Sequence, residues 1–255
     1  MTAFSRFSTG NTNLCAPVDV NGGLLAFKLQ IIDLNFGKRS VFTGIIQKAC
    51  LVSTVEKQTD FCRFSVLLPA ELSAGLQIGA SVAVDGCCQT VTRFEPAAES
   101  SGESAVEVWF DAMQETLRLT TLSSLQPQQA VNIERAAKFG QEIGGHELSG
   151  HVDATINIVA LETTAENHII TLELPGDMSP YVFNKGYLGI HGASLTVSDL
   201  DKARGTFRVY LIPETLRVTN LGGLKSGDTV NLEIDRRTQV IVDTVNAYLD
   251  EQSTE

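Results

Sequence analysis

Two short stretches of the sequence carry small reactive side chains in the same arrangement. Cys88 and Thr90 follow an Asp-Gly dipeptide, and Ser194 and Thr196 follow a His-Gly dipeptide. Side chains two residues apart in a strand lie on the same face, so each stretch presents a thiol or hydroxyl beside a second hydroxyl. Such groups can act as nucleophiles or transfer protons. The alternative is that small residues only close a tight hairpin at both places.

A glycine-rich segment between the two stretches contains two histidines, His146 and His151. The helical zinc-protease motif requires histidines at i and i+4, and these two are one residue further apart. A strand would direct them to opposite faces, and no cysteine or carboxylate lies nearby at ligand spacing. The spacing therefore does not favour a metal site. His151 is the better candidate for acid, base or ligand-binding chemistry, and a polar residue without a chemical role is the alternative.

The two stretches belong to an internal duplication. Three pairs of segments match in the same order, namely residues 84–91 with 190–197, residues 115–118 with 214–217, and residues 131–134 with 230–233. The first copy is longer because it contains a Glu/Ser/Ala-rich stretch, which we expect to be a solvated loop. Self-similarity of this kind indicates two copies of one domain.

Composition excludes several classes of protein. The 255 residues suffice for two domains, and 19% charged with 43% hydrophobic residues is typical of a soluble globular protein. A net charge of −11 argues against nucleic acid or an anionic membrane as partner. The five cysteines are irregularly spaced, which favours a reducing cytoplasm over a disulfide scaffold. Neither a dinucleotide-binding nor a P-loop motif occurs.

Short β-branched runs separated by turn residues predict an all-β sandwich or small barrel in each copy. In the first copy, the expected strands are residues 41–46, 64–68, 81–93 (two strands broken at Asp85-Gly86), 106–110 and 130–134. In the second copy, they are residues 152–159, 168–174, 187–190, 193–197, 205–211 and 229–234.

The sequence pattern changes after Asp235, where apolar residues recur at helical spacing. One helix face would carry Ile241, Val242, Val245, Tyr248 and Leu249. Asp235 or Thr238 could cap the start of this helix. Its apolar face needs a surface to pack on, which is either one of the barrels or the equivalent helices of an oligomer.

Several of these segments also carry a family resemblance, namely residues 41–46, 85–91, 143–152, 194–197 and 212–216. Together they resemble riboflavin synthase of the alpha-chain type, a family of lumazine-binding domains, and the likeness runs from Val41 to about Leu249. The resemblance implies two similar Greek-key antiparallel β-barrels in tandem plus a C-terminal α-helix, assembled as a homotrimer. Lumazine synthase is a candidate protein partner.

The resemblance also implies a reaction, the last step of riboflavin biosynthesis. Two molecules of 6,7-dimethyl-8-ribityllumazine would dismutate to riboflavin and 5-amino-6-(D-ribitylamino)uracil, with no cofactor and no metal. In the family, each active site lies between the first barrel of one chain and the second barrel of a neighbour. Two copies of one domain suit a reaction between two identical molecules, because holding the pair together makes the encounter effectively intramolecular.

Residues that match the family's motifs are candidates for the site. The resemblance implies that the catalytic candidates are Cys88, His151, Ser194 and Asp235, with Ser81 as a weaker one. It implies substrate binding by Gly44, Ile45, Ile46, Cys88, Gln89, Thr90, Asp111, Ala112, Met113, Gln114, Glu115, Thr116, Gly150, His151, Val152, Lys185 (from the neighbouring chain), Ser194, Leu195, Thr196, Tyr210, Leu211, Ile212, Pro213, Glu214 and Thr215.

Two positions depart from the family's pattern. His191 stands where the family usually has Asp, which changes a charge in the pocket, and Gln89 stands where Leu is usual. Gln89 would lie on the strand face opposite to Cys88 and Thr90, so we expect it to pack rather than react. The rival function is that of a lumazine protein, which holds a lumazine or flavin as a fluorescent antenna without catalysis. The intact catalytic candidates favour the enzyme.

The domain boundaries follow from the repeat. We expect an N-terminal extension at residues 1–40, a first barrel at 41–146, a second barrel at 147–235 and an oligomerisation helix with a tail at 236–255. The first barrel is expected to carry a complete pocket of its own. The extension has no counterpart in the second copy, and it is either a docking tail or a disordered or untranslated stretch. Because a GTG start codon read internally encodes valine, translation is expected to begin at Val41.

Overall fold

The computed structural model describes residues 40–97, 105–164 and 167–253. The expectations for the N-terminal extension lie, except for Ser40, outside the described residues.

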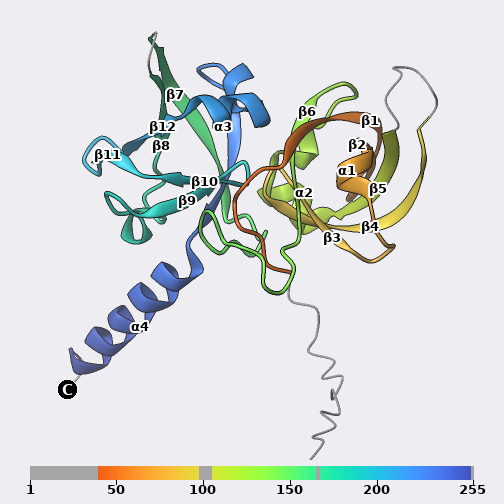
Figure 1. Ribbon diagram of the computed structural model, residues 1–255. Helices are drawn as coiled ribbons and strands as arrows, with labels where there is room; N and C mark the ends of the chain where they lie inside the picture. Colours follow the sequence, from red (N-terminus) through yellow and green to blue (C-terminus); the bar gives the residue numbers. More distant parts are fainter. Residues whose placement is uncertain (1–39, 98–104, 165–166, 254–255) are drawn as a thin grey trace, which may run out of the picture. The chain divides into compact units, whose positions relative to one another are not determined.

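The first copy folds into a closed antiparallel barrel of six strands (Figure 1). The strands are β1 (Lys48–Gln58), β2 (Phe61–Pro69), β3 (Ser81–Val84), β4 (Cys87–Pro96), β5 (Ala105–Met113) and β6 (Ala130–Arg135). Their order around the barrel is β1-β2-β5-β4-β3-β6, in which β3, β4 and β5 are consecutive and β2 returns to lie beside β5, as in a Greek key. Its short helices are α1 (Ala70–Ser73), α2 (Gln114–Leu119) and η1 (Thr121–Ser124).

The second copy repeats this plan in a nearly closed barrel (Figure 1). Its strands are β7 (Ala154–Thr163), β8 (His168–Glu173), β9 (Tyr187–Ile190), β10 (Ala193–Thr196), β11 (Ser198–Asp201), β12 (Thr206–Leu211) and β13 (Thr229–Ile234). The sheet order is β10-β9-β13-β7-β8-β12-β11, so both edges are formed by β10 and β11, which only Val197 separates. Its short helices are η2 (Ser179–Tyr181), α3 (Pro213–Val218) and η3 (Asn220–Gly223). The expectation of two antiparallel Greek-key barrels is confirmed.

Each barrel has its own apolar core, because alternate residues of each strand point inward. In β2, Phe64 and Val66 are fully buried, and the Phe64 ring lies 5.4 Å from that of Phe110 on β5. In the second barrel, Leu172 and Phe207 occupy the corresponding interior. The strand periodicity in the sequence thus reports the two cores correctly.

The segment that precedes each barrel crosses to the other one. Ile46, from the first copy, packs into the core of the second barrel, and Val152, from the second copy, packs into the core of the first. Residues 41–46 were expected to form the first strand, and that expectation is wrong. Strand β1 begins at Lys48, and Phe42 forms an isolated bridge with Leu148 instead. The backbone of this segment bonds to Leu148, to the Glu134 side chain and to Ser194 of the second barrel, and not, among the described residues, to the backbone of a neighbouring strand of its own barrel.

Helix α4 (Arg236–Gln252) follows the second barrel directly. The Asp235 carboxylate caps it by accepting hydrogen bonds from the backbone N–H groups of Arg237 and Thr238 at 3.2 Å, which confirms one of the two expected caps. Four of the five residues of the apolar face are exposed in the described chain, with exposed fractions between 50% and 64% for Ile241, Val245, Tyr248 and Leu249, whereas Val242 is half-buried. None of the described helices is long and apolar enough to cross a membrane.

Candidate functional site

Cys88 is positioned by a glycine turn that backs onto its counterpart in the second barrel. Asp85 and Gly86 both have positive φ, as a type I′ hairpin requires, and so do His191 and Gly192. A Cβ on Gly86 would lie 2.6 Å from the backbone nitrogen of Gly192. Only glycine allows the two turns to approach this closely, so the turns that precede both reactive stretches also join the barrels.

A pocket of about 170 Å³ opens beside Cys88 and brings six of the expected site residues together. They are Cys88, Glu115, Thr116, Gly150, His151 and Val152. The Cys88 backbone N–H donates a hydrogen bond to the carbonyl oxygen of Gly150 at 2.8 Å. The last three residues come from the start of the second copy, so the expectation that the first copy carries a complete pocket is wrong. The crossing of the segments is the physical reason.

The thiol of Cys88 is half-buried, and burial raises its pKa, while Ser81 and Ser40 act in the opposite direction through hydrogen bonds. Ser81 pairs with Thr90 across the β3–β4 hairpin and lies 2.5 Å from Ser40 between their hydroxyl oxygens. The resting Cys88 is therefore a thiol at neutral pH, and it needs a base before it can act as a nucleophile. The expected catalytic candidate Ser81 does lie beside it.

Ser194 occupies the equivalent position in β10 but has a different partner. Its Oγ lies 2.6 Å from Nδ1 of His146, and the His146 ring stacks on Tyr187 with 5.6 Å between centroids. Burial lowers the pKa of His146, Asp235 opposes this and Arg237 adds to it. A neutral imidazole at this distance can accept the hydroxyl proton of Ser194.

The Ser194–His146 pair was not predicted from the sequence, because His146 was considered only as a possible metal ligand. The duplicated spacing could have found it. His146 stands where the first copy has Ser40, and Ser40 likewise lies near the reactive residue of its own barrel. Asp235, an expected catalytic residue, interacts electrostatically with His146 and also caps α4.

The remaining expected residues are distributed over several environments. Gln89, Ala112, Leu195 and Leu211 are buried within the barrels, and Gln89 donates hydrogen bonds to the sulfur of Cys87 and the carbonyl of Cys88. The residues in or next to helices α2 and α3 are mostly exposed, namely Met113, Gln114, Tyr210, Ile212, Pro213 and Glu214, whereas Thr215 is half-buried. Asp111 forms a bidentate ion pair with Arg63 at 2.9 and 3.0 Å. Lys185 is exposed and forms no ion pair with any described residue.

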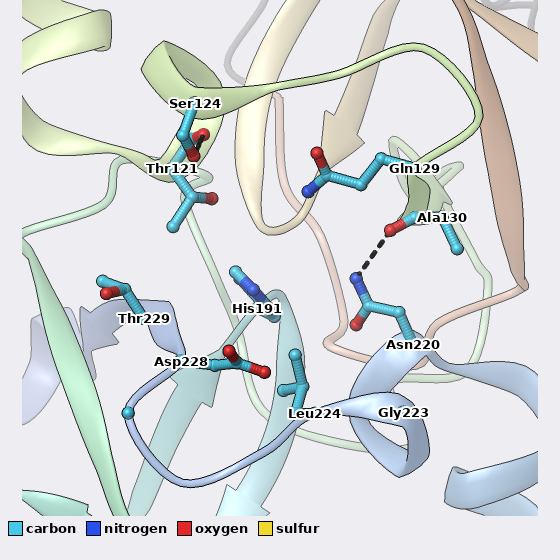
Figure 2. Close-up of a pocket in the computed structure, with 11 residues that line it drawn as sticks. Thr121, Ser124, Gln129, Ala130, His191, Asn220, Gly223, Leu224, Asp228 and Thr229 are labelled. Atoms are coloured by element: carbon cyan, nitrogen blue, oxygen red, sulfur yellow. Dashed lines mark hydrogen bonds between the residues drawn. The ribbon is translucent and has the colours of Figure 1, made fainter.

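A larger pocket, of about 530 Å³, lies where the two copies meet and was not expected from the sequence (Figure 2). Equivalent positions of both copies line it, such as Thr121 with Asn220 and Gln129 with Asp228. His191 also lines this pocket, and its Nδ1 accepts a hydrogen bond from the backbone N–H of Asn231 at 3.1 Å. Figure 2 shows the Asn220 side chain bonded to the carbonyl of Ala130, across the two copies.

The departure at His191 therefore affects the junction between the barrels. Burial raises the pKa of Asp85 and lowers the pKa of His191, and each charge favours the ionised form of the other. Asp85 accepts hydrogen bonds from the backbone N–H of Asn132 at 2.8 Å and from the Asn220 side chain at 3.0 Å. Among the described residues, no group of three or more His, Cys, Asp or Glu side chains is arranged to hold a metal ion.

Comparison with known proteins gives the family. A model of the lumazine binding domain matches twice, at residues 43–136 and 149–235. The riboflavin synthase of Escherichia coli (strain K12) is 43% identical over 210 residues, which covers 82% of this chain and 93% of that protein. The riboflavin synthase of Chlamydia pneumoniae is 40% identical over 209 residues, covering 82% and 97%. The chain belongs to the riboflavin synthase family.

Solved structures with the same fold include LumP complexed with riboflavin, with a TM-score of 0.68 and 24% identity over 76% of this chain and all of LumP. LumP complexed with 6,7-dimethyl-8-(1'-D-ribityl) lumazine gives a TM-score of 0.65 at the same identity, over 76% of this chain and 99% of LumP. At this identity the likeness shows the fold alone. The site residues are therefore compared with the riboflavin synthase family and not with LumP. The two matches of the family model agree with the duplication in the sequence.

Proposed function

We propose that this chain is a riboflavin synthase. It converts two molecules of 6,7-dimethyl-8-ribityllumazine into riboflavin and 5-amino-6-(D-ribitylamino)uracil. The atoms of the two substrate molecules equal those of the two products together, so no external oxidant or reductant is required. The observation that carries the proposal is the presence of two equivalent sites with different chemistry, a thiol in one and a serine–histidine pair in the other.

The two sites have different chemical roles in the reaction. The C7 methyl group of one lumazine must lose a proton, and C7 of the other must accept a nucleophile. Neutral His146 can take the proton of the Ser194 hydroxyl or of a bound water, which generates the nucleophile. At the first site, exposed His151 accepts or returns a proton while the Cys88 thiol donates a hydrogen bond to the bound ring.

The active assembly is a homotrimer in which the first barrel of one chain faces the second barrel of its neighbour. The apolar face of α4 supports this proposal, because Ile241, Val245, Tyr248 and Leu249 are exposed in the described chain. Lys185, exposed and without an ion pair in the described chain, would reach the neighbouring site. The four described cysteines are free thiols, which fits a cytoplasmic protein. Lumazine synthase is its candidate protein partner.

The rival function is that of an antenna protein that binds lumazine without converting it. The fold shared with LumP supports this alternative, whereas Cys88 and the Ser194–His146 pair support the enzyme. Titration with riboflavin tests the two-site arrangement directly, because riboflavin is a product and does not react alone. We expect two sites per chain of unequal affinity by isothermal calorimetry. A single site per chain would contradict the proposed division of work.

A further inference from the structure

Two buried carboxylates occupy equivalent positions on the last strand of each barrel. Glu134 on β6 and Glu233 on β13 are each 3% exposed. Burial raises the pKa of both, so these carboxylates are energetically costly unless hydrogen bonds compensate them. Their retention at the same place in both copies indicates a shared task.

Both carboxylates hold the segment that leads into their own barrel. Glu134 accepts hydrogen bonds from the backbone N–H of Thr43 at 2.6 Å, the Thr43 hydroxyl at 2.7 Å and the backbone N–H of Gly44 at 3.0 Å. Glu233 accepts the same three bonds from Ser149 and Gly150, at 2.7, 2.7 and 3.1 Å. Charge-assisted bonds of this kind are stronger than neutral ones and fix the backbone geometry.

The segments held in this way lie in close contact with the reactive residue of the opposite barrel. The carbonyl of Gly44 accepts a hydrogen bond from the Ser194 N–H at 2.8 Å, and the carbonyl of Gly150 accepts one from the Cys88 N–H at 2.8 Å. A Cβ on Gly44 would lie 2.5 Å from that of Ser194, and a Cβ on Gly150 would lie 2.6 Å from that of Cys88. Both glycines also have positive φ.

We propose that Glu134 and Glu233 are positioning residues for the two substrate sites, and that each acts on the site of the other barrel. Glu233, in the second barrel, sets the geometry around Cys88, and Glu134, in the first barrel, sets the geometry around Ser194. The assignment of these sites to lumazine rests on the proposed function. The crossed arrangement itself rests only on the contacts above.

The carboxylates do not contact the substrate in this proposal. They act by fixing the position of the segment that contacts the reactive residue. Glutamine in place of either glutamate keeps the volume but lacks one acceptor and the charge, so at least one donor of the held segment loses its partner. The segment then moves away from the opposite barrel. Displacements of about 1 Å at a reacting centre can cost a hundredfold in rate, so a loosened segment should impair turnover.

The first test measures the thiol of Cys88 without any lumazine. Cys50, Cys62 and Cys87 are buried, so an aromatic disulfide reagent reports Cys88 once Cys15 has been replaced by serine. We expect Glu233→Gln to accelerate the reaction of Cys88 several-fold, because the thiol becomes more accessible. Loss of the Glu233 charge also lowers the pKa of this thiol, so Ser149→Ala, which removes one donor to Glu233 and keeps its charge, is measured alongside and should still accelerate the reaction. Glu134→Gln is the matched control and should leave this rate unchanged, as should the exposed Glu56→Gln.

The second test examines the Ser194 site in the same way. It follows the pKa of His146 through its imidazole proton resonances. Its pKa is lowered by burial, and Thr43 lies close to the adjacent Gly145. We expect Glu134→Gln to raise the pKa of His146 toward the ordinary histidine value and Glu233→Gln to leave it unchanged. If a glutamine variant fails to fold, Thr43→Ala and Ser149→Ala remove one donor each and should give the same crossed pattern at smaller amplitude.

Equal effects of both variants on both reporters would overturn the proposal, because they would mean general loosening. No effect in folded variants would overturn it as well. Turnover is measured in parallel, and both glutamine variants should lower kcat/KM. A wild-type protein that fails to turn over lumazine would contradict the proposed function and leave the two reporter tests intact.

Discussion

Cys88 and Ser194 illustrate how equivalent residues acquire different chemistry from their neighbours. Both are the second residue of a strand that follows a glycine turn, and both donate their backbone N–H to a glycine carbonyl of the other copy. Beside Cys88 stand the hydroxyls of Ser81 and Ser40, whereas beside Ser194 stands the imidazole of His146. Ser194 therefore has a base within hydrogen-bond distance, whereas the candidate base for Cys88 among the described residues is exposed His151, which lines the same pocket.

Substitution at the first site should slow chemistry more than binding. We expect Cys88→Ser and His151→Gln each to lower kcat by about a hundredfold or more, within the range of general acid–base effects, with little change in lumazine affinity. Single-turnover rates and equilibrium titrations separate the two quantities. Wild-type rates in both variants would remove these residues from the reaction path.

The pH dependence should report His146. Burial lowers its folded pKa below the ordinary value of about 6.5, so the imidazole stays neutral further into the acid range. Activity that requires neutral His146 is therefore retained below the ordinary value and falls only as the pH drops through the folded pKa. His146→Gln should lower the rate and abolish this acid limb in the kcat profile. An identical limb in that variant would assign it to another group.

The same shift has a consequence for stability. A histidine with a depressed folded pKa binds fewer protons in the folded than in the unfolded chain. The free energy of unfolding therefore falls as the pH drops below about 6.5 toward the folded pKa, and His191, buried at the junction, acts in the same direction.

At the scale of elements, the strands were predicted better than the connections between them. Alternating burial in β2 and the turn at Asp85-Gly86 are local properties, and local patterns report them. Residues 41–46 have the composition of a strand, yet their partners are Glu134 and the second barrel, which no local pattern encodes. The pairing of His146 with Ser194 likewise joins residues far apart in sequence. Family motifs predicted Cys88 and His151 as site residues, and the contacts that position them required the structure.

The crossed segments determine how the isolated first domain can bind riboflavin. A fragment of residues 41–146 lacks Gly150 to Val152, which complete the pocket of Cys88. Residues 44–46 of a second copy are equivalent to these, so we expect the fragment to bind riboflavin as a dimer that exchanges this segment. Light scattering and fluorescence quenching over a concentration series test whether riboflavin binding depends on dimerisation of the fragment. A monomer that binds riboflavin, or a folded dimer that does not, would contradict it.

At the scale of the whole molecule, the exposed face of α4 should hold the proposed trimer together. Burial of Ile241, Val245, Tyr248 and Leu249 would be worth several kcal/mol at about 25 cal/mol per Å², before the cost of ordering. Truncation after Asp235 should give smaller species by light scattering and, because the proposed sites lie between chains, should reduce activity. An unchanged, fully active trimer would refute this role of the helix.

As a riboflavin synthase, this chain should catalyse a reaction between two identical substrate molecules. The most direct measurement is incubation of the purified protein with 6,7-dimethyl-8-ribityllumazine alone, followed by absorbance and chromatography. We predict the accumulation of riboflavin over many turnovers, with one riboflavin formed for every two lumazine molecules consumed and an equal amount of the uracil product. Lumazine that is bound, fluorescent and unchanged after prolonged incubation would contradict the account and identify an antenna protein instead.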